Sequence, residues 1–97
     1  MSFEIVLAPE AVKDLRALKA TVRATVKAAL EAHLRNEPRK TSRSRIKQLR
    51  GIRRPQYRLR VGELRVFYDV SGSAVEILAI VLKSEAQAWL AQFGNPA

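Results

Sequence analysis

Apolar residues recur with a helical period in the first third of the chain. Val12, Leu15 and Leu18 fall on one face of a helix that Pro9 can begin, because the first turn of a helix makes no use of the missing N–H. A second apolar stripe runs from Val22 to Leu34 with the same spacing. The pattern therefore predicts two consecutive helices joined by a short turn.

The period changes to two after residue 56, which is typical of half-buried strands. The alternation is interrupted only by Gly62 and Glu63, and a two-residue loop with glycine first is typical of a type II′ hairpin. This loop fixes a register in which the alternating apolar residues of both strands, Phe67 apart, lie on one face of the sheet. The predicted register pairs Val61 with Leu64, Leu59 with Val66 and Tyr57 with Tyr68.

The remaining segments complete one α+β domain over residues 1–97. Phe3 to Leu7 is short and rich in β-branched residues, which predicts a first strand, and Val75 to Leu82 is apolar on both faces, as expected of a central strand. The run from Ser84 to Gln87 matches a capping box, so we expect a closing helix that ends at Gly94. The predicted order is β-α-α-β-β-β-α, with a mostly antiparallel four-stranded sheet, a helical hairpin and the helices on one face.

Charge is concentrated in one segment of the chain. The net charge is +9, yet residues 38–62 contain ten basic residues and no acid, while the rest of the chain holds eight basic and nine acidic residues. A block of like charges repels itself, and a polyanion relieves that repulsion. We therefore expect residues 39–54 to form a loop, with at most a turn of helix, that binds nucleic acid. The alternative is a solvated loop that serves only solubility.

The predicted hairpin gathers arginines on the face opposite its apolar residues. Arg60 lies across from Arg65, and Arg58 lies across from Phe67. Like charges directly opposite each other destabilise a strand pair, unless an anion bridges them, and arginine binds phosphate through two parallel hydrogen bonds. The alternative is a set of ordinary surface charges. Phe67 could stack on an unpaired base, whereas the two tyrosines of the hairpin are expected in the core.

Several function classes are excluded or disfavoured by composition. The chain has no cysteine, which excludes disulfides and thiolate chemistry, and its one histidine, His33, falls on the buried stripe of the second helix. We therefore expect no metal site and no cofactor. No apolar run is long enough to span a bilayer and no secretory signal is present, so we expect a cytoplasmic protein. Any catalysis would depend on positive charge, which suits RNA because its 2′-hydroxyl is an internal nucleophile.

Several motifs resemble the RelE/ParE superfamily of bacterial toxins over nearly the whole chain. They are Ala8-Pro9-Glu10-Ala11-Val12-Lys13-Asp14-Leu15, Leu49-Arg50-Gly51, Tyr57-Arg58-Leu59-Arg60-Val61-Gly62, Leu64-Arg65-Val66-Phe67-Tyr68 and a last strand followed by Lys83. The resemblance implies a RelE-like fold and a cognate antitoxin that wraps the toxin. It also implies one of two activities, cleavage of mRNA in the ribosomal A site or inhibition of DNA gyrase. The short helical hairpin favours the RelE-like branch.

The resemblance also assigns roles to individual residues. It places Arg58, Arg60 and Arg65 around the scissile phosphate and matches Arg50 to the arginine of the family's Leu-Arg-Gly motif. This chain departs from the family where Ser84 replaces an arginine that acts as general acid and Leu90, next to Trp89, replaces a tyrosine that stacks on a base. Arg58 and Arg60 also replace lysines, and arginine is a poor general base. Lys83 is the remaining candidate proton donor.

The leading hypothesis is therefore the toxin of a type II toxin–antitoxin system that acts as a ribosome-dependent, metal-independent mRNA endonuclease. The residues expected to bind RNA are Arg43, Arg45, Lys47, Arg50, Arg53, Arg54 and Phe67. The expected partners are an acidic antitoxin, with which the toxin could form a heterotetramer, and the ribosome with its mRNA; no membrane is involved. The alternatives are a ParE-like gyrase inhibitor, a translation blocker that does not cleave, and an RNA-binding domain outside toxin systems.

Overall fold

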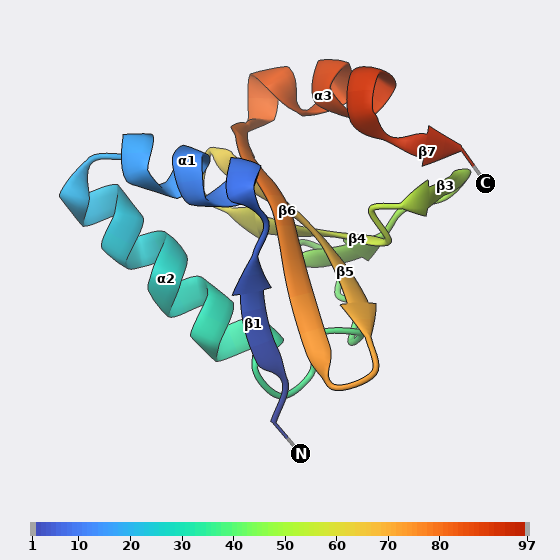
Figure 1. Cartoon of the computed structure of the whole chain (residues 1–97), viewed down its shortest axis with the longest axis horizontal. Coiled ribbons are helices and arrows are strands. Elements are labelled where there is room, and N and C mark those ends of the chain that lie inside the picture. Colours follow the sequence, from blue (N-terminus) through green and yellow to red (C-terminus); the bar gives the residue numbers. More distant parts are fainter. Residues whose placement is uncertain (1, 97) are drawn as a thin grey trace.

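The computed structural model describes residues 2–96 and shows an α+β fold, as predicted from the sequence (Figure 1). Its elements are β1 (Glu4–Leu7), α1 (Pro9–Ala17), α2 (Ala20–Leu34), β2 (Ile46–Gln48), β3 (Ile52–Arg54), β4 (Tyr57–Val61), β5 (Leu64–Ser71), β6 (Ala74–Leu82), the 3₁₀ turn η1 (Lys83–Glu85), α3 (Ala86–Phe93) and β7 (Asn95–Pro96). The main sheet has the order β1-β6-β5-β4-β2. β1 is parallel to β6, and the other pairs are antiparallel.

The hairpin of β4 and β5 has the register predicted from the sequence. Val61 pairs with Leu64 and Tyr57 pairs with Tyr68. Gly62 has a φ of 56°, in the left-handed region that glycine adopts without strain, and no other residue type in the described chain has a positive φ. This combination agrees with a type II′ turn, whose twist matches that of the flanking strands.

The segment expected to be a loop contains two short strands, so the predicted four-stranded sheet has five strands. Ile46 of β2 is buried and pairs with Leu59 of β4, which adds β2 to the edge of the sheet. Ser42 covers the outer edge of β2, because its N–H donates to the Ile46 carbonyl at 2.9 Å and its hydroxyl accepts the N–H groups of Arg45 and Ile46. β3 pairs with β7 in a second, two-stranded sheet.

The helices α1 and α2 cover one face of the main sheet and enclose the core. Val26, Leu30 and Leu34 repeat every four residues along α2 and are buried against the apolar face of β4, β5 and β6. At the centre Tyr68 is fully buried, stacks on Tyr57 with 5.4 Å between ring centroids, and donates its hydroxyl to the Pro38 carbonyl at 2.7 Å. Burial raises the pKa of the Tyr68 phenol, which keeps this hydroxyl a donor.

The closing helix α3 lies on the opposite face of the sheet, which corrects the expectation that all helices share one face (Figure 1). Trp89 of α3 stacks on Phe67 of β5, with 4.8 Å between ring centroids and 7° between the ring planes. The expected capping box at Ser84 does not form, because residues 83–85 make a 3₁₀ turn and the helix begins at Ala86 without a side-chain cap. Its end before Gly94 is as predicted.

Candidate nucleic-acid interface

Cations from three adjacent strands lie together on the outer face of the sheet, the face that α1 and α2 leave uncovered. Lys47 of β2 pairs with Arg58 of β4, and Arg60 of β4 pairs with Arg65 of β5. The Arg60 N–H also donates to the Arg45 carbonyl at 2.8 Å, which places Arg45 beside Arg60. We call Arg45, Lys47, Arg58 and Arg60 the basic row. Neighbouring strands are about 4.8 Å apart, so these charges are close enough to share one anion.

Arg65 belongs to the same cluster but is buried beneath it. Only 5% of its surface is exposed, and its Nη1 donates to the carbonyls of Gly62 at 2.9 Å and Leu64 at 2.8 Å. Burial lowers the pKa of Arg65, and the nearby charges of Arg58 and Arg60 lower it further. The strand register places the three arginines predicted to converge at neighbouring positions of β4 and β5, with the Arg65 guanidinium held by the backbone of the β4–β5 turn.

The cluster has more hydrogen-bond donors than acceptors. The Nε of Arg58 is buried and has no hydrogen-bond partner among the described residues, and within residues 2–96 no carboxylate forms an ion pair with Arg58, Arg60 or Arg65. A buried donor without a partner costs about 1–3 kcal/mol. An anion bound over β4 would reduce the repulsion between the cations and, once the Arg58 side chain turns outward, would accept a hydrogen bond from its Nε.

Arg54 does not join this cluster, although the sequence placed it among the RNA-binding residues. Its Nη1 lies 3.2 Å from Oδ2 of Asp69, and its Nη2 lies 3.0 Å from Oε1 of Glu76. These two carboxylates are cross-strand neighbours on β5 and β6, and they hold β3 against the main sheet. Because both ends of the guanidinium are occupied by the chain's own acids, Arg54 is not available to bind phosphate in this structure.

Phe67 is also unavailable in the role proposed for it. Its side chain is fully buried beneath Trp89, so no face of the ring is left for a base. The physical reason is that α3 packs over β5, which sequence periodicity could not indicate. Trp89, which is only partly buried, is the aromatic residue that borders the basic row on this side.

The other predicted site residues are exposed and lie in segments next to the strands of the basic row. Arg43 precedes β2, Arg50 lies between β2 and β3, and Arg53 lies on β3. Lys83 is exposed at the end of β6, where its N–H donates to the Glu63 carbonyl at 2.8 Å and so holds it beside the β4–β5 turn. His33 is half-buried on α2; burial lowers its pKa and the charge of Arg45 lowers it further.

The ionisation of Asp69 gives a testable pH dependence. Burial raises the pKa of Asp69 above its ordinary 3.8, although the Gln56 N–H and the charge of Arg54 lower it. Since the folded state then holds this proton more tightly than the unfolded state, stability is lost as pH rises through the raised pKa. We expect Asp69→Asn, which keeps an oxygen acceptor for Gln56, to remove this loss. Urea unfolding of both proteins at several pH values measures their free energies of unfolding. A difference between the two free energies that stays constant with pH would contradict this prediction.

Among the described residues, positive charge is the main feature that could support catalysis. No group of three His, Cys, Asp or Glu side chains within residues 2–96 is placed to hold a metal ion, and no helix in that range is long and apolar enough to cross a membrane. The basic row can bind a phosphate and stabilise negative charge that develops on it. Its three arginines are poor general bases, because arginine scarcely gives up its proton.

Comparison with known structures shows the same fold in toxins. The RelE–RelB complex from Pyrococcus horikoshii matches with a TM-score of 0.71 and 24% identity, over 89% of this chain and 100% of that one. A mutant RelE toxin from E. coli in the free state matches with a TM-score of 0.71 and 23% identity, over 92% of each chain. The RelBE2 complex from Mycobacterium tuberculosis matches with a TM-score of 0.68 and 23% identity, over 84% of this chain and 92% of that one. No curated protein sequence matches the chain.

The sequence itself settles the family. The profile of the ParE toxin of the type II toxin–antitoxin system parDE matches residues 5–87, from β1 into α3. The match therefore includes both helices of the hairpin, the main sheet apart from Glu4, and every residue of the basic row. This chain belongs to the ParE toxin family, and it is the toxin of a type II toxin–antitoxin system.

Proposed function

We propose that this toxin stops translation by cleaving mRNA on the ribosome, with the RNA backbone bound along the basic row. The observation that supports this most directly is the excess of donors around Arg58, whose buried Nε has no partner among the described residues. Arg60 is exposed beside it and has no carboxylate partner in residues 2–96. An RNA phosphate is the acceptor that these two guanidinium groups fit best.

In the proposed reaction the substrate supplies its own nucleophile. The RNA 2′-hydroxyl loses its proton to water and attacks the adjacent phosphorus, the P–O5′ bond breaks to leave a 2′,3′-cyclic phosphate, and the leaving 5′-oxygen takes up a proton. Arg58 and Arg60 would orient the phosphate and stabilise the charge that develops on its oxygens, with the buried charge of Arg65 behind them. Lys83, held beside the β4–β5 turn, is the proposed proton donor to the leaving oxygen. No metal is needed for these steps.

The exposed cations around the row extend the proposed contact to the ribosome. Arg43, Arg50 and Arg53 project from the segment between α2 and β4 and would bind ribosomal RNA, while Arg45 and Lys47 continue the row. These sequence-independent contacts would place the toxin on its target and make binding sensitive to salt. The proposed site of action is the cytoplasm. Before toxin release the antitoxin would cover the row, in a complex that we propose to be a heterotetramer.

A second function is favoured by two features. Nη1 of Arg65 donates to the carbonyls of Gly62 and Leu64, and the arginines of the row are poor general bases. Both features suit a toxin that inhibits by binding alone, either as a ParE-like inhibitor of DNA gyrase or as a translation blocker. In that case the basic row would bind nucleic acid without cutting it.

Expression of the toxin without its antitoxin separates these functions. Mapping of transcript 5′ ends, with DNA-damage signalling followed in parallel, is the measurement. We expect new ends within translated codons, and we expect them to vanish when translation initiation on the reporter transcript is blocked. Intact transcripts with an SOS response would show gyrase inhibition, and intact transcripts with arrested protein synthesis would show a block without cleavage.

A further inference from the structure

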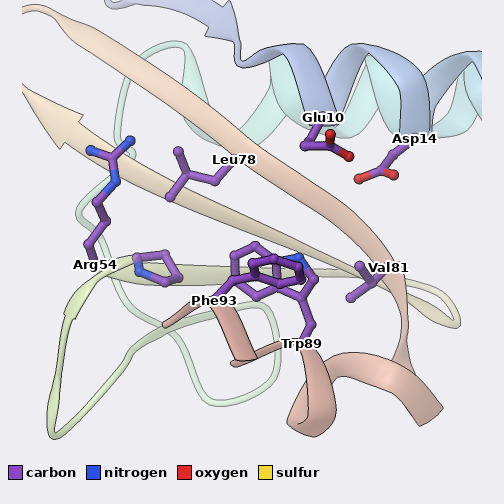
Figure 2. A pocket seen from close by; sticks show the side chains of 8 residues that line it. Glu10, Asp14, Arg54, Leu78, Val81, Trp89 and Phe93 are labelled. Atoms are coloured by element: carbon purple, nitrogen blue, oxygen red, sulfur yellow. The ribbon is translucent and has the colours of Figure 1, made fainter. Parts of the chain in front are cut away.

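An apolar groove lies on the outer face of the sheet, between α1 and α3 (Figure 2). The basic row lies on the other side of α3. It encloses about 430 Å³, which is within the range of binding pockets. The floor and one wall are apolar and include Leu78 and Val81 of β6 with Trp89 and Phe93 of α3. Phe93 remains 54% exposed, although it is one of the largest apolar side chains of the molecule. A groove of this kind gains stability when another apolar surface covers it.

Two carboxylates from α1 form the opposite rim of the groove. Glu10 and Asp14 are four residues apart, so they lie on the same face of the helix, and Figure 2 shows both above the aromatic wall. Oδ2 of Asp14 accepts the Ile80 N–H at 2.9 Å, which fixes this carboxylate against β6. The only ion pair of Glu10 within the described chain is a 3.9 Å contact with the exposed Lys13.

The cation at the far end of the groove does not neutralise these acids. Arg54 lines the pocket, but its guanidinium is paired with Asp69 and Glu76. The groove therefore presents negative charge and aromatic surface in a chain whose net charge is +9. A ligand that matches it has a positive charge on an apolar stem, and such a cation also gains from the faces of Trp89 and Phe93.

We propose that this groove binds the antitoxin, through an apolar segment that carries a lysine or arginine. The rim carboxylates repel phosphate, so nucleic acid is disfavoured here. A second copy of this chain would bring together two molecules of the same large positive charge, whereas an acidic antitoxin is attracted to the toxin as a whole. The inferred anchor is thus a locally basic, apolar segment within a partner of opposite net charge. The proposal depends on the toxin family but not on RNA cleavage.

Neutralising the rim while keeping the bond to Ile80 tests the charge requirement. In the purified complex with the cognate antitoxin, we expect Glu10→Gln with Asp14→Asn to weaken antitoxin binding about tenfold and to flatten its salt dependence. The matched control is Glu31→Gln with Glu37→Gln, which removes two exposed charges of the same sign, one on α2 and one in the segment after it, both outside the groove. Calorimetric titration at two salt concentrations measures both pairs. Equal affinity for the two double variants would overturn the proposal.

A photo-crosslinker locates the occupant without disturbing the rim. Replacement of Phe93 by benzoylphenylalanine keeps an aromatic side chain in the groove, and mass spectrometry identifies the attached peptide. We expect an antitoxin peptide with a lysine or arginine between apolar residues. Attachment to a second toxin chain, to an antitoxin segment without a basic residue, or to nothing in the intact complex would overturn the proposal. The crosslinked peptide also identifies the occupant of the groove if the Asp14 variant does not fold. Neither measurement involves RNA, so a failure here is distinct from a failure of the cleavage proposal.

Discussion

Tyr68→Ala is expected to lower the free energy of unfolding by about 3–5 kcal/mol, the typical cost of truncating a buried aromatic residue. Tyr68 is fully buried at the centre of β5 and stacks on Tyr57. Its removal leaves a cavity between the sheet and α2 that the packed core can only partly fill. The structure also loses the hydrogen bond from the Tyr68 hydroxyl to the carbonyl of Pro38, at the start of the basic segment. Urea unfolding followed by circular dichroism measures the change.

Tyr68→Phe separates the hydrogen bond from the packing. The ring and its stacking remain, but the Pro38 carbonyl loses the hydroxyl that lies 2.7 Å away, so we expect a loss of about 1–2 kcal/mol. Tyr57→Phe is the matched control, because the Tyr57 hydroxyl makes no hydrogen bond to other residues of the described chain and its removal should cost less than about 0.5 kcal/mol. Equal losses for the two variants would contradict the role assigned to the Tyr68 hydroxyl.

The elements predicted correctly from the sequence are those whose signals are local. The β4–β5 hairpin has strict alternation and a glycine that can adopt a φ of 56°, so its register followed from residues 57–70 alone. The strands β2 and β3 have three residues each and carry no alternation of their own. They form because the edge of β4 and the segment β7 offer backbone partners, and such partners are distant in sequence. The formation of β2 and β3 therefore depends on tertiary pairing, which the strand propensity of their own residues does not indicate.

The candidate site was predictable to the same extent. The hairpin register places Arg60 opposite Arg65 and Arg58 opposite Phe67, and both pairs occur. The position of α3 was not predictable, because its aromatic residues fit either face of the sheet. For this reason the burial of Phe67 beneath Trp89 could not be foreseen.

Arg54 could not be assigned from its position in the basic segment. Its partners Asp69 and Glu76 are 15 and 22 residues away and face it only after β3 folds back on the main sheet. A charged run in a sequence thus indicates a candidate nucleic-acid surface, but ion pairs within the fold determine which of its cations stay unpaired. In the described structure Arg54 is paired with the chain's own acids, whereas the cations of β2 and β4 form no ion pair.

Arg60→Ala is expected to slow cleavage of ribosome-bound mRNA by about 10²–10³-fold, as found when one preorganised donor to a developing charge is removed. Because Arg60 is exposed, the free energy of unfolding should change by less than about 0.5 kcal/mol. Lys27→Ala, which removes an exposed charge from α2, is the control for net charge and should cleave at the normal rate. Single-turnover cleavage with purified ribosomes measures the rates.

Arg65→Ala distinguishes contact with RNA from support of the site. Arg65 is buried and holds the β4–β5 turn through two backbone carbonyls, so its loss should lower stability and cleavage together. Arg60→Ala should lower cleavage alone, since we propose that its exposed guanidinium contacts the phosphate. If Arg65→Ala keeps full stability but loses cleavage, Arg65 contacts the phosphate directly. If Arg60→Ala cleaves normally, the basic row does not bind the scissile phosphate, and the donors around Arg58 must serve another anion.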